Sequence, residues 1–168
     1  AKSDLSGPST CIETPRSMSA STPSQSDFIG HFESTGLSQR QKSILERITH
    51  FFTEENIREM LVPLIDQTSD ISLRALDWLV TNYSKKHNIV CRSNQHGNQL
   101  FNIYHGYKVA LSHFRRRNFD PFRRRNRIRV IIRDEVVCDT TVGQCNFLNW
   151  AHFNGVMDYS RANSREIE

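Results

Sequence analysis

The sequence predicts an α+β fold, in which N-terminal helices pack with a small antiparallel β-sheet and a C-terminal helix. Apolar residues recur at helical spacing between Ser38 and Lys86. The pattern then changes to short apolar runs and to strict alternation, which is typical of strands. Helical and strand-like segments do not alternate regularly, so we expect an antiparallel sheet rather than the parallel sheet of α/β proteins.

The first 36 residues have a different composition from the rest of the chain. They contain nine serines, four threonines and three prolines, and their apolar residues are isolated or paired at most. Such a segment cannot bury enough apolar surface to offset the entropy lost on ordering. We therefore expect a disordered tail over residues 1–36, dispensable for folding, and a single α+β domain over residues 37–168.

Three helices are predicted in the first half of the domain. Ser38 and Gln41 form a capping-box pattern that opens the first helix. The second begins at Thr53, and Pro63 is expected to kink or end it. The third runs roughly from Ser72 to Lys86. Its Trp78, like Trp150 near the C-terminus, has apolar neighbours on both flanks, so we expect both tryptophans to be core anchors.

The second half mixes strands and helices. Residues 89–91 and 100–104 predict a β-hairpin, and a short helix follows that has Arg115 to Arg117 at its end. In residues 127–132, Ile128, Val130 and Ile132 alternate with Arg127, Arg129 and Ile131. This alternation predicts a strand with one apolar face and one mostly basic face. A second capping-box pattern at Thr141 and Gln144 opens a last apolar helix, and Gly155 is expected to end it.

The most unusual stretch is Phe114–Arg133, which holds nine arginines, one acidic residue and no lysine. Its net charge is 9 − 1 = +8, whereas the whole chain carries only +4, so the other residues sum to −4. Arginine presents a planar fork of donors that grips phosphate or carboxylate at two points. The candidate nucleic-acid-binding residues are Arg115, Arg116, Arg117, Arg123, Arg124, Arg125, Arg127 and Arg129, and the candidate base-stacking residues are Phe119 and Phe122.

Three interpretations of this stretch remain open. Contacts with phosphates would give a nucleic-acid-binding protein, with DNA as the first candidate partner. Contacts with acidic side chains would instead give a structural protein that docks on an acidic protein surface, as in a particle shell. The arginines could also pair with the acidic residues of this chain, with both phenylalanines in the core. On the first interpretation, Arg123, Arg124 and Arg125 point outward and carry most of the non-specific affinity.

Signatures of catalysis are missing from the sequence. It contains no GxGxxG, no GxxxxGK[ST] and no GxSxG motif, so we expect no enzymatic activity and no cofactor. The four cysteines form no CxxC pair, so we expect neither a metal site nor a disulfide framework. No run of about 18 apolar residues exists, so no membrane span is expected.

Three segments together carry a family resemblance: ISLRALDWLVTNYSKKHNIV (71–90), FNIYHGYKVALSHFRRRNFDPFRRRNRI (101–128) and TTVGQCNFLNWAHFNGVMDY (140–159). They resemble an uncharacterised protein family of nucleocytoplasmic large DNA viruses of the iridovirus and phycodnavirus kind. The resemblance implies a viral protein made in the cytoplasm or nucleus of an infected cell, within the viral factory, or carried in the virion. It implies no activity and does not choose between genome binding and a place in the capsid.

Overall fold

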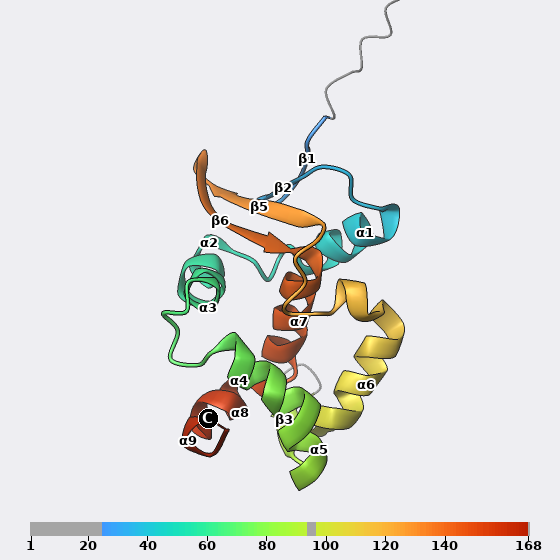
Figure 1. The fold of residues 1–168 in the computed structure, drawn as a ribbon, viewed down its shortest axis with the longest axis vertical. Helices are drawn as coiled ribbons and strands as arrows, with labels where there is room; N and C mark the ends of the chain where they lie inside the picture. Colours follow the sequence, from blue (N-terminus) through green and yellow to red (C-terminus); the bar gives the residue numbers. More distant parts are fainter. Residues whose placement is uncertain (1–24, 94–96, 168) are drawn as a thin grey trace, which may run out of the picture.

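The computed structural model describes residues 25–93 and 97–167. Within them the chain forms a four-stranded antiparallel sheet, a separate two-stranded hairpin and a set of helices (Figure 1), which confirms the α+β fold. The sheet lies at one end of the molecule, and helix α7 (Val142–Phe153) runs from it through the centre. The other helices surround α7, so this helix is the core element of the fold.

The four-stranded sheet has the order β1-β2-β5-β6. Its strands are β1 (Asp27–Ile29), β2 (Phe32–Ser34), β5 (Arg127–Ile132) and β6 (Glu135–Thr141). The alternation predicted for residues 127–132 is confirmed, because Ile128, Val130 and Ile132 are buried while Arg127 and Arg129 are exposed.

The predicted tail boundary at residue 36 is wrong. Residues 27–34 form the hairpin β1–β2, and β2 pairs with β5 so that Phe32 faces Val130. Phe32 is fully buried and packs edge-on against Phe52. Phe32 stands in a polar segment and therefore gives no periodic signal in the sequence. Strand β5, which is distant in the sequence, supplies the apolar surface that orders the hairpin. The expectation of disorder over residues 1–24 lies outside the described residues.

The N-terminal helices follow the predicted pattern, with two π-helical turns that the pattern did not indicate. Helix α1 (Gln39–Ile48) begins with the full capping box: the Ser38 hydroxyl accepts from the Gln41 amide, and Gln41 Oε1 accepts from the Ser38 amide. The second helix comprises α2 (Glu54–Asn56), η1 (Ile57–Leu61) and α3 (Val62–Ile65). Pro63 is the second residue of α3, just after the π-helical turn η1, and it has no amide hydrogen to donate to the preceding turn.

The third helix comprises α4 (Leu73–Trp78), the π-helical turn η2 (Leu79–Tyr83) and α5 (Ser84–His87), with Ser72 as its cap. The hairpin of β3 (Val90–Ser93) and β4 (Gln99–Asn102) follows, as predicted. Helix α6 (Ile103–Phe114) then leads to a 3-10 turn, η4 (Arg116–Asn118). After α7, Gly155 takes a left-handed conformation, and α8 (Val156–Ala162) and α9 (Ser164–Ile167) complete the described chain.

The two tryptophans occupy different environments. Trp150 is 9 % exposed and lies in the core, as predicted. The same prediction for Trp78 is wrong, because its side chain is 42 % exposed. Trp78 is two residues from each of the buried residues Leu76 and Val80, and residues two apart on a helix point to nearly opposite sides. Apolar neighbours in the sequence therefore do not imply burial at this position.

We predict that the two phenylalanines of the N-terminal hairpin contribute very differently to stability. Phe32→Ala should lower the free energy of unfolding by about 3–5 kcal/mol, because it empties a fully buried site. Phe28→Ala, at a position that is 59 % exposed, is the matched control and should change it by less than about 0.5 kcal/mol. Urea denaturation measures both. Equal effects would contradict the burial of the hairpin in the core.

Candidate nucleic-acid interface

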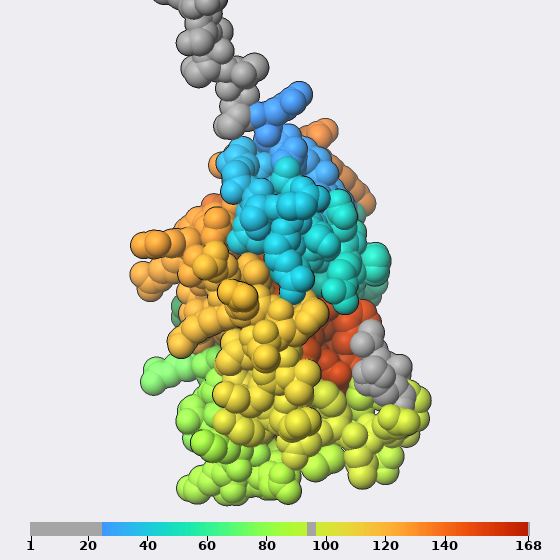
Figure 2. Space-filling model, turned by 90° about the vertical axis from the view of Figure 1, so that its right-hand side faces the viewer, coloured from blue at the N-terminus to red at the C-terminus, as the bar shows by residue number. Residues whose placement is uncertain are grey.

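The arginine stretch leaves α6 through an abrupt change of backbone direction. Arg115 has a φ of 67°, which non-glycine residues seldom adopt, and η4 follows at once. From there the chain runs along the surface to the start of β5 at Arg127. Figure 2 shows this segment in gold and orange beside α1 and α6, with its orange part protruding from one side of the molecule.

Phe119 anchors the middle of the segment in the core. Its side chain is 1 % exposed, stacks on Phe114 with ring centroids 5.7 Å apart, and meets Phe147 and Trp150 edge-on at 5.5 Å each. The assignment of Phe119 as a base-stacking residue is therefore wrong, because no face of the ring is accessible. Phe122 is 50 % exposed, so its ring remains available for stacking.

The backbone on both sides of Phe119 is held by the first half of α7. Asn146 Nδ2 donates to the Asn118 carbonyl oxygen at 2.8 Å, and Gln144 Nε2 donates to the Pro121 carbonyl oxygen at 3.1 Å. Gly143 lies so close that a Cβ there would be 2.9 Å from the Asp120 carbonyl oxygen. The Thr141 hydroxyl caps α7 as predicted, but the Gln144 side chain binds Pro121 instead of completing the capping box.

Two of the eight candidate arginines have acidic partners in the described part of the chain. Arg116 lies 4.0 Å from Asp120, and Arg129 lies 3.9 Å from Asp139. Exposed pairs of this kind contribute at most about 1 kcal/mol, and a phosphate can displace them at little cost. The other six have no acidic group within 4.0 Å among residues 25–93 and 97–167: Arg115, Arg117, Arg123, Arg124, Arg125 and Arg127.

The structure gathers these arginines around two pockets. The first, which we call the helix-end pocket, has a volume of about 560 Å³ and is lined by Arg40, Arg115 and Arg117. The second, the loop pocket, has a volume of about 250 Å³ and is lined by Arg123, Arg124 and Arg127, together with Asp139, the partner of Arg129. Arg40 was not a candidate, because only the fold brings the first turn of α1 to the end of α6.

Arg123 differs from the two arginines that follow it. Arg124 and Arg125 are exposed, as expected, but Arg123 is half-buried, so the expectation that all three point outward is wrong for it. Its Nε atom is buried and has no hydrogen-bond partner among the described residues. A buried charged donor without a partner is costly, which makes an anion in the loop pocket a favourable addition.

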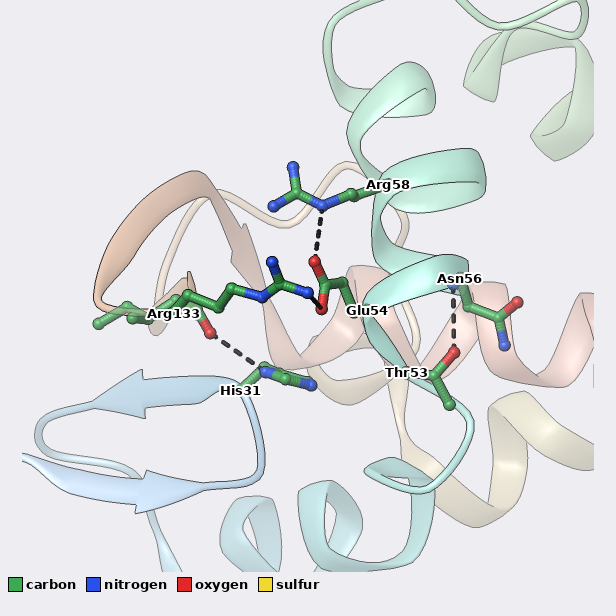
Figure 3. Close-up of polar contacts among 7 residues, drawn as sticks. His31, Thr53, Glu54, Asn56, Arg58 and Arg133 are labelled. Carbon is green, nitrogen blue, oxygen red and sulfur yellow. Dashed lines mark hydrogen bonds and ion pairs between the residues drawn. The ribbon is translucent and has the colours of Figure 1, made fainter.

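Arg133, the ninth arginine of the stretch, belongs to a different part of the surface. It lies at the tip of the β5–β6 hairpin and donates to Glu54 at 3.3 Å, while Arg58 donates to the other oxygen of the same carboxylate at 3.2 Å. Figure 3 shows Glu54 between the two arginines, and His31 on the neighbouring hairpin beside them. Both guanidinium groups at this hairpin tip thus share one acidic partner.

The three cysteines of the described chain are protonated at neutral pH. Burial raises the pKa of Cys91 to about 11 and those of Cys138 and Cys145 to about 12, so these thiols are neutral at pH 7. Across residues 25–93 and 97–167, no three His, Cys, Asp or Glu side chains cluster closely enough to hold a metal ion. Within the same residues, no helix has the length and apolar character needed to cross a membrane.

One carboxyl group next to the arginines has a perturbed pKa. Burial raises the pKa of Asp77, the negative charge of Asp120 raises it further, and Arg116 opposes both effects. The fold thus brings α4 close to the turn at Asp120, which the sequence did not indicate. Because the charged form of Asp77 is disfavoured in the folded state, its ionisation costs stability.

We predict that Asp77→Asn stabilises the protein at pH 7. The parent loses stability as the pH rises from the ordinary aspartate pKa of about 3.9 through the raised folded-state pKa, whereas the amide does not ionise. The melting temperature of the variant should therefore exceed that of the parent at pH 7, and the gap should close below about pH 3.9. Asp66→Asn, at the exposed end of α3, is the control. A variant that is less stable than the parent at pH 7 would contradict the prediction.

Comparison with known proteins places this fold in a family. The model of a family described as "Family of unknown function (DUF7197)" matches residues 25–168. An uncharacterised protein of Acanthamoeba polyphaga mimivirus, L507, is 32 % identical over 137 residues, which cover 77 % of this chain and 52 % of that protein. This chain therefore spans about half the length of the curated relative, and the expected resemblance to an uncharacterised viral protein is confirmed. No solved structure matches significantly. The chain belongs to the DUF7197 family of unknown function.

Proposed function

We propose that this protein binds nucleic acid through its phosphate backbone and does so without catalysing a reaction. The observation that carries the proposal is the loop pocket, where Arg123, Arg124 and Arg127 face one space of about 250 Å³ and Arg123 Nε is buried without a partner among the described residues. A phosphate in this pocket would accept from the guanidinium groups of Arg124 and Arg127, next to the buried Arg123 Nε. Phosphate contacts also account for most of the affinity of non-specific nucleic-acid binding.

The arrangement of the charges supports a polymer rather than a single small anion. Along the chain, the arginines of the two pockets lie on either side of buried Phe119, and all of them except Arg40 belong to one continuous surface segment. A strand with regularly spaced phosphates can occupy both pockets at once. Phe122, exposed next to the loop pocket, can stack on a base of the same strand.

The viral relative is consistent with DNA as the partner. We place the chain with the proteins of nucleocytoplasmic large DNA viruses and expect it to act in the cytoplasm or nucleus of the infected cell, within the viral factory. The alternative is a structural virion or minor capsid-type protein whose arginines dock on an acidic protein. The two functions differ in one measurable property, which is binding to purified nucleic acid of random sequence.

We predict that Arg124→Ala/Arg125→Ala leaves the fold intact, because both side chains are exposed. It should weaken DNA binding and lower the slope of log K against log salt by about 0.9 per lost contact on duplex DNA, or by about 0.7 on single strands. The loss should be similar for every base sequence, since phosphate contacts carry no sequence information. Fluorescence anisotropy across a salt series measures it.

The matched control removes two arginines from the opposite end of β5. Arg58→Ala/Arg133→Ala changes the net charge by the same amount but affects only the pair that binds Glu54. It should keep the salt slope of the parent. Equal slopes for all three proteins would refute the proposed phosphate contacts. A parent protein that binds no DNA but assembles with viral capsid protein would establish the alternative.

A further inference from the structure

A second site lies beside the helix-end pocket, between α1, α6 and α7. This cleft, which we call the central cleft, has a volume of about 300 Å³. Ile44 and Ile48 of α1 line one side, and Phe114, Trp150 and Phe153 supply aromatic surface. In Figure 2 the cleft region is seen where the red surface of the C-terminal helices shows between α1 and α6. Its size is at the lower end of the range for ligand pockets, which suits one small ring system.

We propose that the central cleft binds one unpaired nucleobase of a single-stranded nucleic acid. The polar groups of the cleft favour this class of ligand. Three asparagines of or next to α7 line it, and two of them are engaged: Asn146 Nδ2 donates to Asn118, and Asn154 Nδ2 donates to the Trp150 carbonyl oxygen at 2.9 Å. Asn149 is different, because its Oδ1 atom is buried and has no partner among the described residues.

Asn149 lines the cleft, and its side-chain amide has no hydrogen bond to the described residues. Its Oδ1 atom points inward, so a rotation of the amide would present both the acceptor and the amide donor to an occupant of the cleft. A donor and an acceptor side by side on one planar group match the edge of a nucleobase, as in the two-point contact of asparagine with adenine. The aromatic and aliphatic walls suit the apolar faces of the ring. A sugar would need several hydrogen-bonding groups, whereas the cleft has a single unused amide among its three asparagines.

The surroundings of the cleft supply positive charge for the phosphate of the same nucleotide. Arg47 and His50 line the cleft, and Phe114 lines both the cleft and the helix-end pocket with its three arginines. No acidic residue of the described chain lines either space. A base in the central cleft would thus have its phosphate near Arg115 or Arg117. In this respect the inference rests on the proposed function. It also specifies that the bound nucleic acid is single-stranded, because a base within a duplex is already paired and stacked.

The test compares two single-stranded probes of about 12 nucleotides, one carrying bases and one abasic, with the same phosphate charge. The parent should bind the base-bearing probe at least about fivefold more tightly than the abasic probe. Asn149→Leu keeps the size of the side chain and removes both hydrogen-bonding groups, so it should reduce this ratio. Asn82→Leu, at an exposed position on η2, is the matched control and should keep the ratio of the parent.

A second measurement follows the cleft directly. In a Trp78→Phe background, Trp150 is the sole tryptophan of the chain, and a base stacked in the cleft should quench its fluorescence. The abasic probe should not. Titration with free mononucleotides distinguishes a nucleotide-binding protein from a strand-binding one. If a mononucleotide quenches Trp150 at the same concentrations as the strand, the polymer is not required for binding. Asn149→Asp, which keeps the size and removes the donor, replaces Asn149→Leu if the latter does not fold.

The outcomes separate this inference from the proposed function. Equal affinity of the parent for base-bearing and abasic probes, or an unchanged ratio in the folded Asn149 variants, overturns the base site. If Arg124→Ala/Arg125→Ala still lowers the affinity for both probes, the proposed phosphate binding stands without the base site. If neither probe binds and neither strand nor mononucleotide quenches Trp150, both proposals fail.

Discussion

The burial of Phe119 is the contact on which the candidate site depends. Arginine triplets precede and follow this residue. Adjacent like charges repel one another, so they do not by themselves define one path of the chain across the surface. The Phe119 ring defines the path because it packs among Phe114, Phe147 and Trp150. Since burying an aromatic ring contributes several kcal/mol, the ring fixes the middle of the segment and directs the flanking arginines to the two pockets beside it.

Helix α7 joins the core to this surface. Its apolar residues fill the centre of the molecule, while Gln144 and Asn146 in its first half bind the backbone on either side of Phe119. Gly143 allows the close approach, because a side chain there would meet the carbonyl oxygens of Arg117 and Asp120. One helix thus sets both the position of the arginine segment and the floor of the central cleft. Any change that shifts the start of α7 should therefore alter the arginine segment and the central cleft together.

The sequence predicted the features that depend on neighbouring residues. The caps at Ser38 and Thr141 and the alternation in β5 follow from local patterns, and the structure confirms them. The errors share a different cause. Phe32 is ordered by strand β5, about a hundred residues away, and Phe119 by an aromatic cluster drawn from several helices. Such contacts leave no local period. Trp78 was assigned to the core because its neighbours in the sequence are apolar, but the helix turns it away from the buried Leu76 and Val80.

The candidate site was predicted in composition but not in arrangement. The arginine count indicated a phosphate partner, yet only the fold shows that Arg40 joins Arg115, or that Asn149 faces an aromatic cleft. Three buried side-chain atoms lack partners in the described chain, and two of them, Arg123 Nε and Asn149 Oδ1, lie at these pockets. A fold retains unsatisfied groups of this kind at a cost in stability, and such departures from local consistency are expected where function requires them. A phosphate in the loop pocket and a base in the central cleft would belong to one polymer, so both unsatisfied groups would adjoin the same ligand.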